Sequence, residues 1–202
     1  MKLFYTPGTG SLSPHIALRE AGLPFQLERV SLRNQRTETG ADFQVINPHG
    51  YVPVLQLDDG SLLMEGPAIL QFIADRLPER GLAPAQGTLE RYRLQEKLHF
   101  ISSELHIHFA SLVNEAYPEA GKQFARARLA QRFRALEPTL ENSPYLMGER
   151  FTVADAYLFT VLSWCGYLKV DLGPFPALRA FQARILERPC VQQAMKAEGL
   201  LR

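Results

Sequence analysis

Residues 52–67 read Val-Pro-Val-Leu-Gln-Leu-Asp-Asp-Gly-Ser-Leu-Leu-Met-Glu-Gly-Pro, and they carry the clearest structural signal in the chain. Two short apolar runs flank Asp58-Asp59-Gly60, and an Asp-Gly pair between apolar runs is a strong signal for a tight β-hairpin. Gly66-Pro67 then predicts a helix start, because proline suits the first turn of a helix. The stretch therefore predicts strand, turn, strand and helix in that order.

The residues before this stretch predict the rest of a small α/β unit. Residues 2–6 are a short apolar strand candidate, and Ser13-Pro14 predicts a helix in which Ser13 is the cap. Residues 25–32 alternate apolar and polar side chains, which is typical of a second strand, and a short helical segment follows. The full order is strand-helix-strand, helix, strand-strand-helix, which is the order of a thioredoxin-like unit.

The rest of the chain predicts a linker and helices. Residues 77–88 contain two prolines and two glycines and form the best linker candidate. No convincing strand follows, and Thr152-x-x-Asp155 resembles a helix capping box. The predicted helices cover 89–115, 120–140, a segment from Thr152, 178–186 and 191–197. We therefore expect a domain at 1–77, a linker at 78–87 and an all-helical domain at 88–202.

The bulk composition disfavours several classes of function. The 202 residues carry a net charge of +1, so no strong field draws the chain to nucleic acid or a membrane surface. No apolar run approaches the ~20 residues of a membrane span, and no signal peptide is visible. Two cysteines without a Cys-x-x-Cys motif predict free thiols in a reducing, cytoplasmic setting. The histidine spacing predicts no metal site.

Two short motifs could bind a peptide ligand. A cis Val52-Pro53 bond would turn the Val52 N–H and C=O out of the sheet, where an extended peptide could pair with both. The alternative is a trans proline that merely starts an edge strand. Glu65-Gly66 offers a carboxylate for an ammonium group and a helix N-terminus for a carboxylate, which suits the head group of an amino acid. The alternative is a helix start with an exposed acid.

A third candidate lies on the first long predicted helix. His99, Ser103 and His106 are spaced i, i+4 and i+7 and are expected to share one face. This face differs from the apolar stripe of the same helix. The alternative for His106 is a helix-face histidine with an ordinary hydrogen bond.

Residues 47–53, 58–66 and 151–157 together resemble the cytosolic glutathione transferases. Residues 1–8 and the Ser103–His106 segment make the chain similar to the bacterial beta class, and the resemblance covers nearly the whole length. It implies the glutathione transferase fold, an α/β thioredoxin-like N-terminal domain followed by an all-α C-terminal domain. It also implies a symmetric homodimer with glutathione as co-substrate.

The resemblance assigns roles to single residues. Val52 and Pro53 would hold the cysteinyl part of glutathione, and Glu65 and Gly66 its γ-glutamyl end. Gln35 stands where beta-class members often have lysine and could donate to the glycyl carboxylate, although it could also be an ordinary loop residue. The matching helix face, with His99, Ser103 and His106, would look into the active site, and His106 matches the family's active-site histidine.

The turn after the first strand departs from the beta-class pattern. Gly10 stands where that class usually carries a cysteine, so disulfide chemistry through this position is impossible. Ser11 is the leading candidate to hydrogen-bond the ligand thiolate, with Tyr5, Thr9, a backbone N–H near Gly10 and His106 as other groups. The alternative for Ser11 is a serine that binds only backbone.

Two functions therefore compete. The first is a glutathione S-transferase-like enzyme that transfers glutathione to a small hydrophobic electrophile, without the usual cysteine. The second is a glutathione-binding or regulatory protein on the same scaffold with little catalysis. Gly10 favours the second function, whereas the intact Val52-Pro53 and Glu65-Gly66 motifs count against a loss of glutathione binding.

Overall fold

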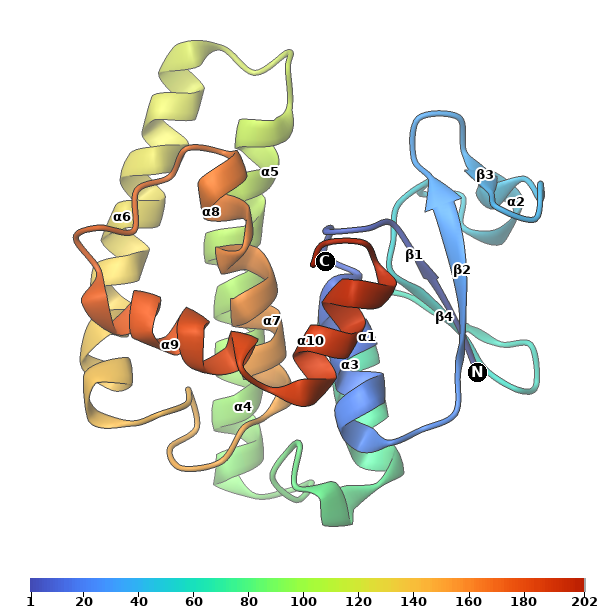
Figure 1. The fold of residues 1–202 in the computed structure, drawn as a ribbon, viewed down its shortest axis with the longest axis horizontal. Helices are drawn as coiled ribbons and strands as arrows, with labels where there is room; N and C mark the ends of the chain where they lie inside the picture. The colour runs from blue at the N-terminus through green and yellow to red at the C-terminus, as the bar shows by residue number, and fades with distance from the viewer. Residues whose placement is uncertain (202) are drawn as a thin grey trace. The chain divides into compact units, whose positions relative to one another are not determined.

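The computed structural model describes residues 1–201, and the chain forms two compact units. The first unit contains residues 1–82 and the segment from Arg188 onward, and the second contains residues 83–187 (Figure 1). The elements of the first unit are β1 Lys2–Tyr5, α1 Leu12–Ala21, β2 Gln26–Ser31, β3 Arg36–Thr37, α2 Phe43–Ile46, β4 Val54–Gln56, β5 Leu62–Leu63, α3 Gly66–Arg76, a 3₁₀ turn Pro78–Arg80 and α10 Pro189–Ala197.

A five-stranded mixed sheet in the order β3-β2-β1-β4-β5 forms the centre of the first unit. Strand β1 pairs parallel with β2 and antiparallel with β4, and β4 and β5 form the antiparallel hairpin that the Asp-Gly turn predicts. Helices α1 and α3 pack against each other, while Phe43 of α2 contacts Phe4 of β1 at a ring distance of 5.9 Å. The thioredoxin-like prediction is confirmed.

The last helix packs with the first unit, although the predicted all-helical domain at 88–202 includes it. Helix α10 lies against α1 (Figure 1). Just beyond α10, the buried Glu198 carboxylate contacts His15 Nδ1 at 2.8 Å and accepts the Gly8 N–H at 2.9 Å. Arg188 pairs with Glu20 through two contacts of 2.7 and 2.9 Å. Long-range contacts of this kind leave no periodic signal in a sequence.

The second unit is entirely helical in its regular structure. A π-helical segment separates α4 from α5, where the sequence predicts one uninterrupted helix. Helix α6 runs through Pro138, and Asn142 donates to the Pro138 carbonyl near the helix end. The elements are α4 Leu89–Phe100, the π segment Ile101–His106, α5 Ile107–Val113, α6 Glu119–Asn142, α7 Val153–Leu162, α8 Trp164–Tyr167 and α9 Pro176–Leu186.

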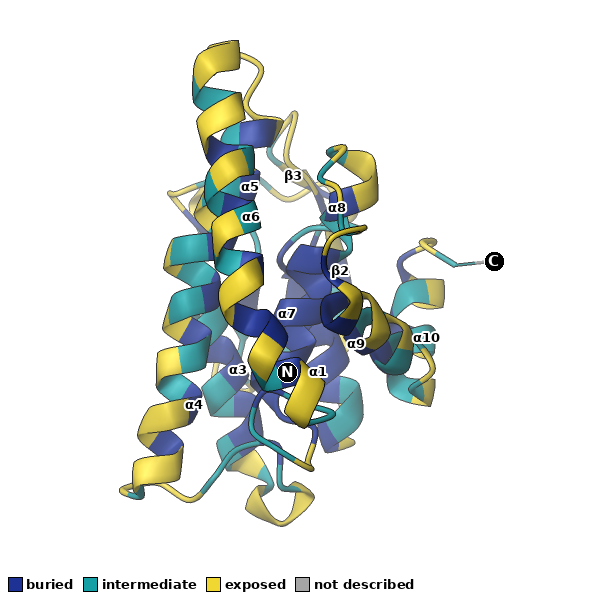
Figure 2. Ribbon diagram, turned by 90° about the vertical axis from the view of Figure 1, so that its left-hand side faces the viewer, coloured by how far each residue is buried: buried dark blue, intermediate teal, exposed yellow. Residues whose placement is uncertain are grey.

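Helix α7 forms the core of the second unit. All ten of its residues are buried, as the dark colour in Figure 2 shows. Asp155 reaches back to the N-terminus of α7, where its carboxylate accepts the Thr152 N–H at 2.8 Å and the Leu146 N–H at 2.8 Å. Burial raises the pKa of Asp155 to about 6, against the hydrogen bonds, which lower it.

Helix α1 begins two residues earlier than predicted. Its cap position is Ser11, and Ser13 lies inside the first turn, where its hydroxyl donates to the Gly10 carbonyl at 2.8 Å. The prediction of Ser13 as the cap is therefore wrong, because this hydroxyl bonds backward to a carbonyl and not forward to a free N–H. Gly22 ends α1 in the left-handed conformation, as predicted.

Within residues 1–201, no helix combines the length and the apolar character that a membrane crossing requires.

Candidate functional site

The N-terminus of α3 presents an open donor beside a carboxylate. Among the described residues, the Gly66 N–H has no acceptor, whereas the N–H groups of Ala68 and Ile69 both donate to the Glu65 carbonyl at 3.0 Å. A Cβ atom added to Gly66 would meet nothing within 4 Å, so the space beside it is open. The exposed Glu65 side chain starts from a backbone with φ of 65°. This arrangement can bind a group that carries both charges.

Tyr51 also belongs to this cluster, although the sequence did not predict it. Its hydroxyl donates to Glu65 Oε1 at 2.7 Å, and this contact raises the pKa of the Tyr51 phenol. The two residues lie fourteen positions apart on opposite sides of the hairpin. Their only sequence signal is that both stand directly beside predicted ligand-binding residues, Val52 and Gly66.

The Val52-Pro53 peptide bond is cis, as the sequence analysis expected. Val52 lies just before β4, and within residues 1–201 neither its N–H nor its C=O makes a backbone hydrogen bond outside the regular elements. Both groups therefore remain available to an extended ligand. Met64 and Val52 pack against the small core around Phe4, which fixes the position of this segment.

Gln35 has a different hydrogen-bonding role from the one predicted. Its Nε2 donates to the carbonyls of Leu32 at 2.8 Å and Gly50 at 3.1 Å, which uses both amide hydrogens. The buried Oε1 has no hydrogen-bond partner. Gln35 therefore connects two loops. The side-chain atom that remains without a partner is Oε1, which can only accept a hydrogen bond.

The turn between β1 and α1 encloses the Ser11 hydroxyl. Ser11 is fully buried, and its Oγ lies 3.2 Å from both the Thr6 N–H nitrogen and the Thr6 carbonyl oxygen and 2.9 Å from Thr9 Oγ1. This geometry agrees with the alternative in which Ser11 binds backbone. The backbone N–H groups of Gly10 and Ser11 have no acceptor among residues 1–201. Tyr5 ends β1 and is buried, which raises the pKa of its phenol.

The three helix-face residues belong to the second unit. His99 and Ser103 are exposed and bond to their own helix, since His99 Nδ1 lies 2.7 Å from the Gln95 carbonyl and Ser103 donates to the His99 carbonyl at 2.9 Å. His106 instead contacts Tyr157 of α7, with Nδ1 2.7 Å from the hydroxyl. Its ring meets Trp164 edge-on at 4.8 Å. His106 thus belongs to an aromatic cluster, and the other two residues do not.

The π segment has a consequence for this face. It covers Ile101–His106 and widens the helix locally, so the i, i+4, i+7 relation expected for an α-helix does not hold across it. His106 ends the segment and turns toward α7, where Tyr157 is buried. Such interruptions often occur at functional positions.

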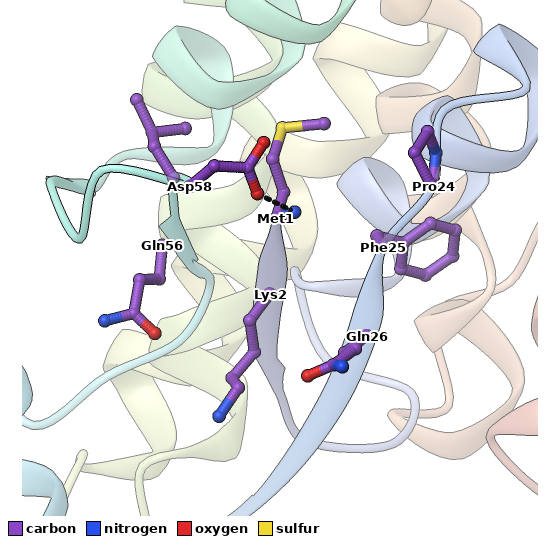
Figure 3. A pocket seen from close by; sticks show the side chains of 8 residues that line it. Met1, Lys2, Pro24, Phe25, Gln26, Gln56 and Asp58 are labelled. Atoms are coloured by element: carbon purple, nitrogen blue, oxygen red, sulfur yellow. Dashed lines mark hydrogen bonds and ion pairs between the residues drawn. The ribbon is translucent and has the colours of Figure 1, made fainter.

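A pocket of about 510 Å³ lies at the other end of β1, around the amino terminus (Figure 3). Its rim includes the Met1 ammonium group, which pairs with Asp58 at 2.7 Å, and the polar row formed by Gln26, Lys2 and Gln56 on neighbouring strands. None of the predicted ligand-binding residues lines it. The predicted head-group site at Glu65 and Gly66 therefore lies outside this pocket.

Both cysteines are free thiols in this structure. Cys165 is buried and Cys190 is partly buried, and neither is in a disulfide. Burial raises the pKa of the Cys165 thiol to about 12. Over residues 1–201, no group of three His, Cys, Asp or Glu side chains is placed to hold a metal ion.

Two family models match this chain. The model described as "Glutathione S-transferase, N-terminal domain" matches residues 11–76, and "Glutathione S-transferase, C-terminal domain" matches residues 100–189. The chain is 46% identical over 200 residues to "Glutathione S-transferase GstA" from Escherichia coli O157:H7, an alignment that covers 99% of this chain and 100% of the relative.

Solved structures agree with the fold. A sphingomonad glutathione S-transferase in complex with glutathione has a TM-score of 0.95 and 46% identity, covering 99% of this chain and 100% of that one. A beta-class glutathione S-transferase from Sphingomonas chungbukensis has a TM-score of 0.96 and 45% identity, and both chains are covered completely. These values confirm the predicted combination of a thioredoxin-like and an all-helical part.

Proposed function

Since this chain belongs to the glutathione S-transferase family and is similar to its bacterial beta class, we propose that it binds glutathione as co-substrate and transfers it to a small hydrophobic electrophile. One observation carries the proposal: the open N-terminus of α3, where the unpaired Gly66 N–H and the Glu65 carboxylate lie side by side. An α-amino acid head group supplies the matching carboxylate and ammonium. The γ-glutamyl end of glutathione is such a group.

The peptide is held by backbone groups in this proposal. Val52 pairs with the cysteinyl residue through its N–H and C=O, as a neighbouring strand would. Gln35 has no free amide hydrogen for the glycyl carboxylate, so we assign it an indirect role in holding the Gly50 loop. Specificity then comes mainly from the γ-glutamyl end.

The sulfur is activated without a cysteine at position 10. A free thiol has a pKa near ~8.5, so only a few per cent is ionised at neutral pH, and a hydrogen bond to the thiolate increases this fraction. The Gly10 and Ser11 N–H groups at the start of α1 lack acceptors and can donate to it. We rank them above the Ser11 hydroxyl, which has three partners of its own. Such fixed donors stabilise charge with little reorganisation.

The second unit supplies the apolar part of the reaction. We propose that His106 and Trp164, with the buried Tyr157 behind them, contact the electrophile or the transferred sulfur. Exposed His99 and Ser103 remain candidates for contacts with glutathione. The protein is expected to act as a homodimer in a reducing cytoplasm, as the family resemblance implies.

A regulatory or binding protein with little catalysis remains the second candidate, because Gly10 offers the sulfur no side chain. One experiment separates the two. Calorimetry measures glutathione affinity, and chlorodinitrobenzene conjugation on the same sample measures transfer. Binding together with conjugation above the uncatalysed rate supports the enzyme. Binding without conjugation supports the regulatory protein, and absence of binding contradicts both.

A further inference from the structure

Tyr51 lies in contact with the proposed head-group site and has no role in the function described so far. Its hydroxyl is 2.7 Å from Glu65 Oε1. The phenol O–H is the donor and the carboxylate oxygen is the acceptor. The second carboxylate oxygen, Oε2, accepts no hydrogen bond from residues 1–201. One oxygen is thus occupied and the other is available.

The backbone of Tyr51 is held by a hydrogen-bonded loop. Asn47 is fully buried, and its side chain donates to the Tyr51 carbonyl at 2.7 Å and accepts the His49 N–H at 3.1 Å. Gly50 has a φ of 71°, which closes the turn just before Tyr51. The rings of His49 and Tyr51 stack at 5.5 Å with an angle of 21° between their planes. These contacts hold the backbone of Tyr51 and place its ring against His49.

Glu65 has an anchored backbone and an exposed side chain. Its carbonyl accepts two N–H groups of α3, which anchors the main chain at its left-handed φ. The side chain is exposed, and nothing but Tyr51 is recorded as holding its carboxylate. An unrestrained glutamate loses considerable rotamer freedom when it binds a ligand. A restraint that exists before binding removes part of that loss.

We propose that Tyr51 is a positioning residue for glutathione: its hydroxyl holds one oxygen of Glu65, so that the other oxygen meets the ammonium group of the γ-glutamyl end. This inference rests on the proposed function and adds a residue to its site. The loop at 47–51 thereby connects the strand that pairs with the peptide, through Val52, to the carboxylate that binds its head group.

The principal test is Tyr51→Phe, with exposed Tyr92→Phe on α4 as the matched control. We expect Tyr51→Phe to raise the Kd and the KM for glutathione about fivefold to tenfold, the worth of one hydrogen bond, with kcat at saturation unchanged. Tyr92→Phe should change neither quantity. An unchanged Kd in Tyr51→Phe overturns the proposal, and so does tighter binding, because the phenol would then compete with the ligand.

Two further arms identify the route of the effect. In a Glu65→Ala background, Tyr51→Phe should have no additional effect on the Kd, because the hydroxyl acts through Glu65. A glutathione analogue without the α-amino group should bind wild type and Tyr51→Phe equally. A full-sized effect in either arm overturns the positioning role, since a general loosening of the loop would persist in both.

A titration without ligand separates this inference from the proposed function. The contact with Glu65 raises the pKa of the Tyr51 phenol. The ultraviolet titration difference between wild type and Tyr51→Phe reports this pKa. When both proteins also carry Glu65→Gln, the pKa obtained in this way should move toward the ordinary phenol value. If wild type binds no glutathione, the proposed function and the role of Tyr51 both fail, even if this shift is present. If wild type binds but the shift is absent, only the role of Tyr51 fails.

Discussion

Helices α3 and α9 begin in similar ways and end up with opposite uses of their N-termini. Each has eleven residues with a proline in the first turn. At α9, the buried carboxylate of Glu137 accepts the Ala177 N–H at 3.2 Å and the Leu178 N–H at 2.8 Å. At α3, the Gly66 N–H has no acceptor among the described residues and the space beside it is open.

The difference shows what an unfilled helix start can do. At α9, the protein supplies its own carboxylate from α6, and the site is closed and structural. At α3, the proposed ligand supplies the carboxylate, and the site is exposed. The same physical interaction, an anion at the positive end of a helix, supports folding at α9 and, in the proposed function, recognition at α3.

Removal of the internal carboxylate should have the largest effect. We expect Glu137→Ala to lower the free energy of unfolding by about 3 kcal/mol, because two buried N–H groups lose their acceptor. Urea unfolding followed by circular dichroism measures this change. The control is Glu141→Ala, an exposed position on the same helix. Equal stabilities of the two variants would contradict the capping role of Glu137.

A third helix start, that of α7, contains a carboxylate whose contribution to stability depends on pH. The folded-state pKa of Asp155, about 6, lies above the ordinary value of 3.8, so folding favours the protonated form. This contribution is complete below about pH 4 and is lost as the pH rises through 6, a change of up to about 3 kcal/mol.

Unfolding free energies between pH 4 and 7 test this statement. Asp155→Asn carries no titrating group at this position, so its free energy of unfolding should decrease less between pH 4 and 7 than that of wild type. A wild-type stability that rises through the same window, with Asp155→Asn removing the rise, would show that the hydrogen bonds from Leu146 and Thr152 outweigh burial.

Glu65→Ala tests the open helix start. We expect glutathione affinity to fall by about 1.5–3 kcal/mol, because the ammonium group loses a charged partner. Thermal unfolding should remain unchanged, since Glu65 is exposed. Calorimetry gives the affinity. The control is Glu79→Ala, an exposed position in the 3₁₀ turn that follows α3. If the Glu65→Ala variant is retained on immobilised glutathione as strongly as wild type, Glu65 does not belong to the binding site.

Ser11→Ala tests the start of α1 and should have the smallest effect on binding. The buried hydroxyl connects Thr6 and Thr9, so its loss should lower the free energy of unfolding by about 1–2 kcal/mol. We expect kcat to change less than twofold to threefold, about 0.5 kcal/mol. A tenfold loss of kcat at unchanged stability would instead assign the thiolate contact to this hydroxyl.

Local signals account for what could be predicted. The Asp-Gly hairpin, the Gly66-Pro67 helix start and the back-bond of Asp155 all involve residues close in sequence, and each is present. Glu137 bonds to the start of α9 across about forty sequence positions, so no sequence periodicity predicts this contact. The Ser11 prediction used residue type alone and could not foresee a hydroxyl already bonded to Thr6. The site residues of both units stay predictions until the variants are measured.

The position of Glu198 has a consequence for the order of events on the ribosome. The first unit needs residues 1–82 together with the segment from Arg188, and the second unit is synthesised between them. At roughly 5–20 residues per second, the nascent first unit waits several seconds for its final helix. During that interval His15 and the Gly8 N–H lack the carboxylate that they contact in the folded chain. The second unit can complete its own helices first, and the segment from Arg188 then completes the fold of the first unit.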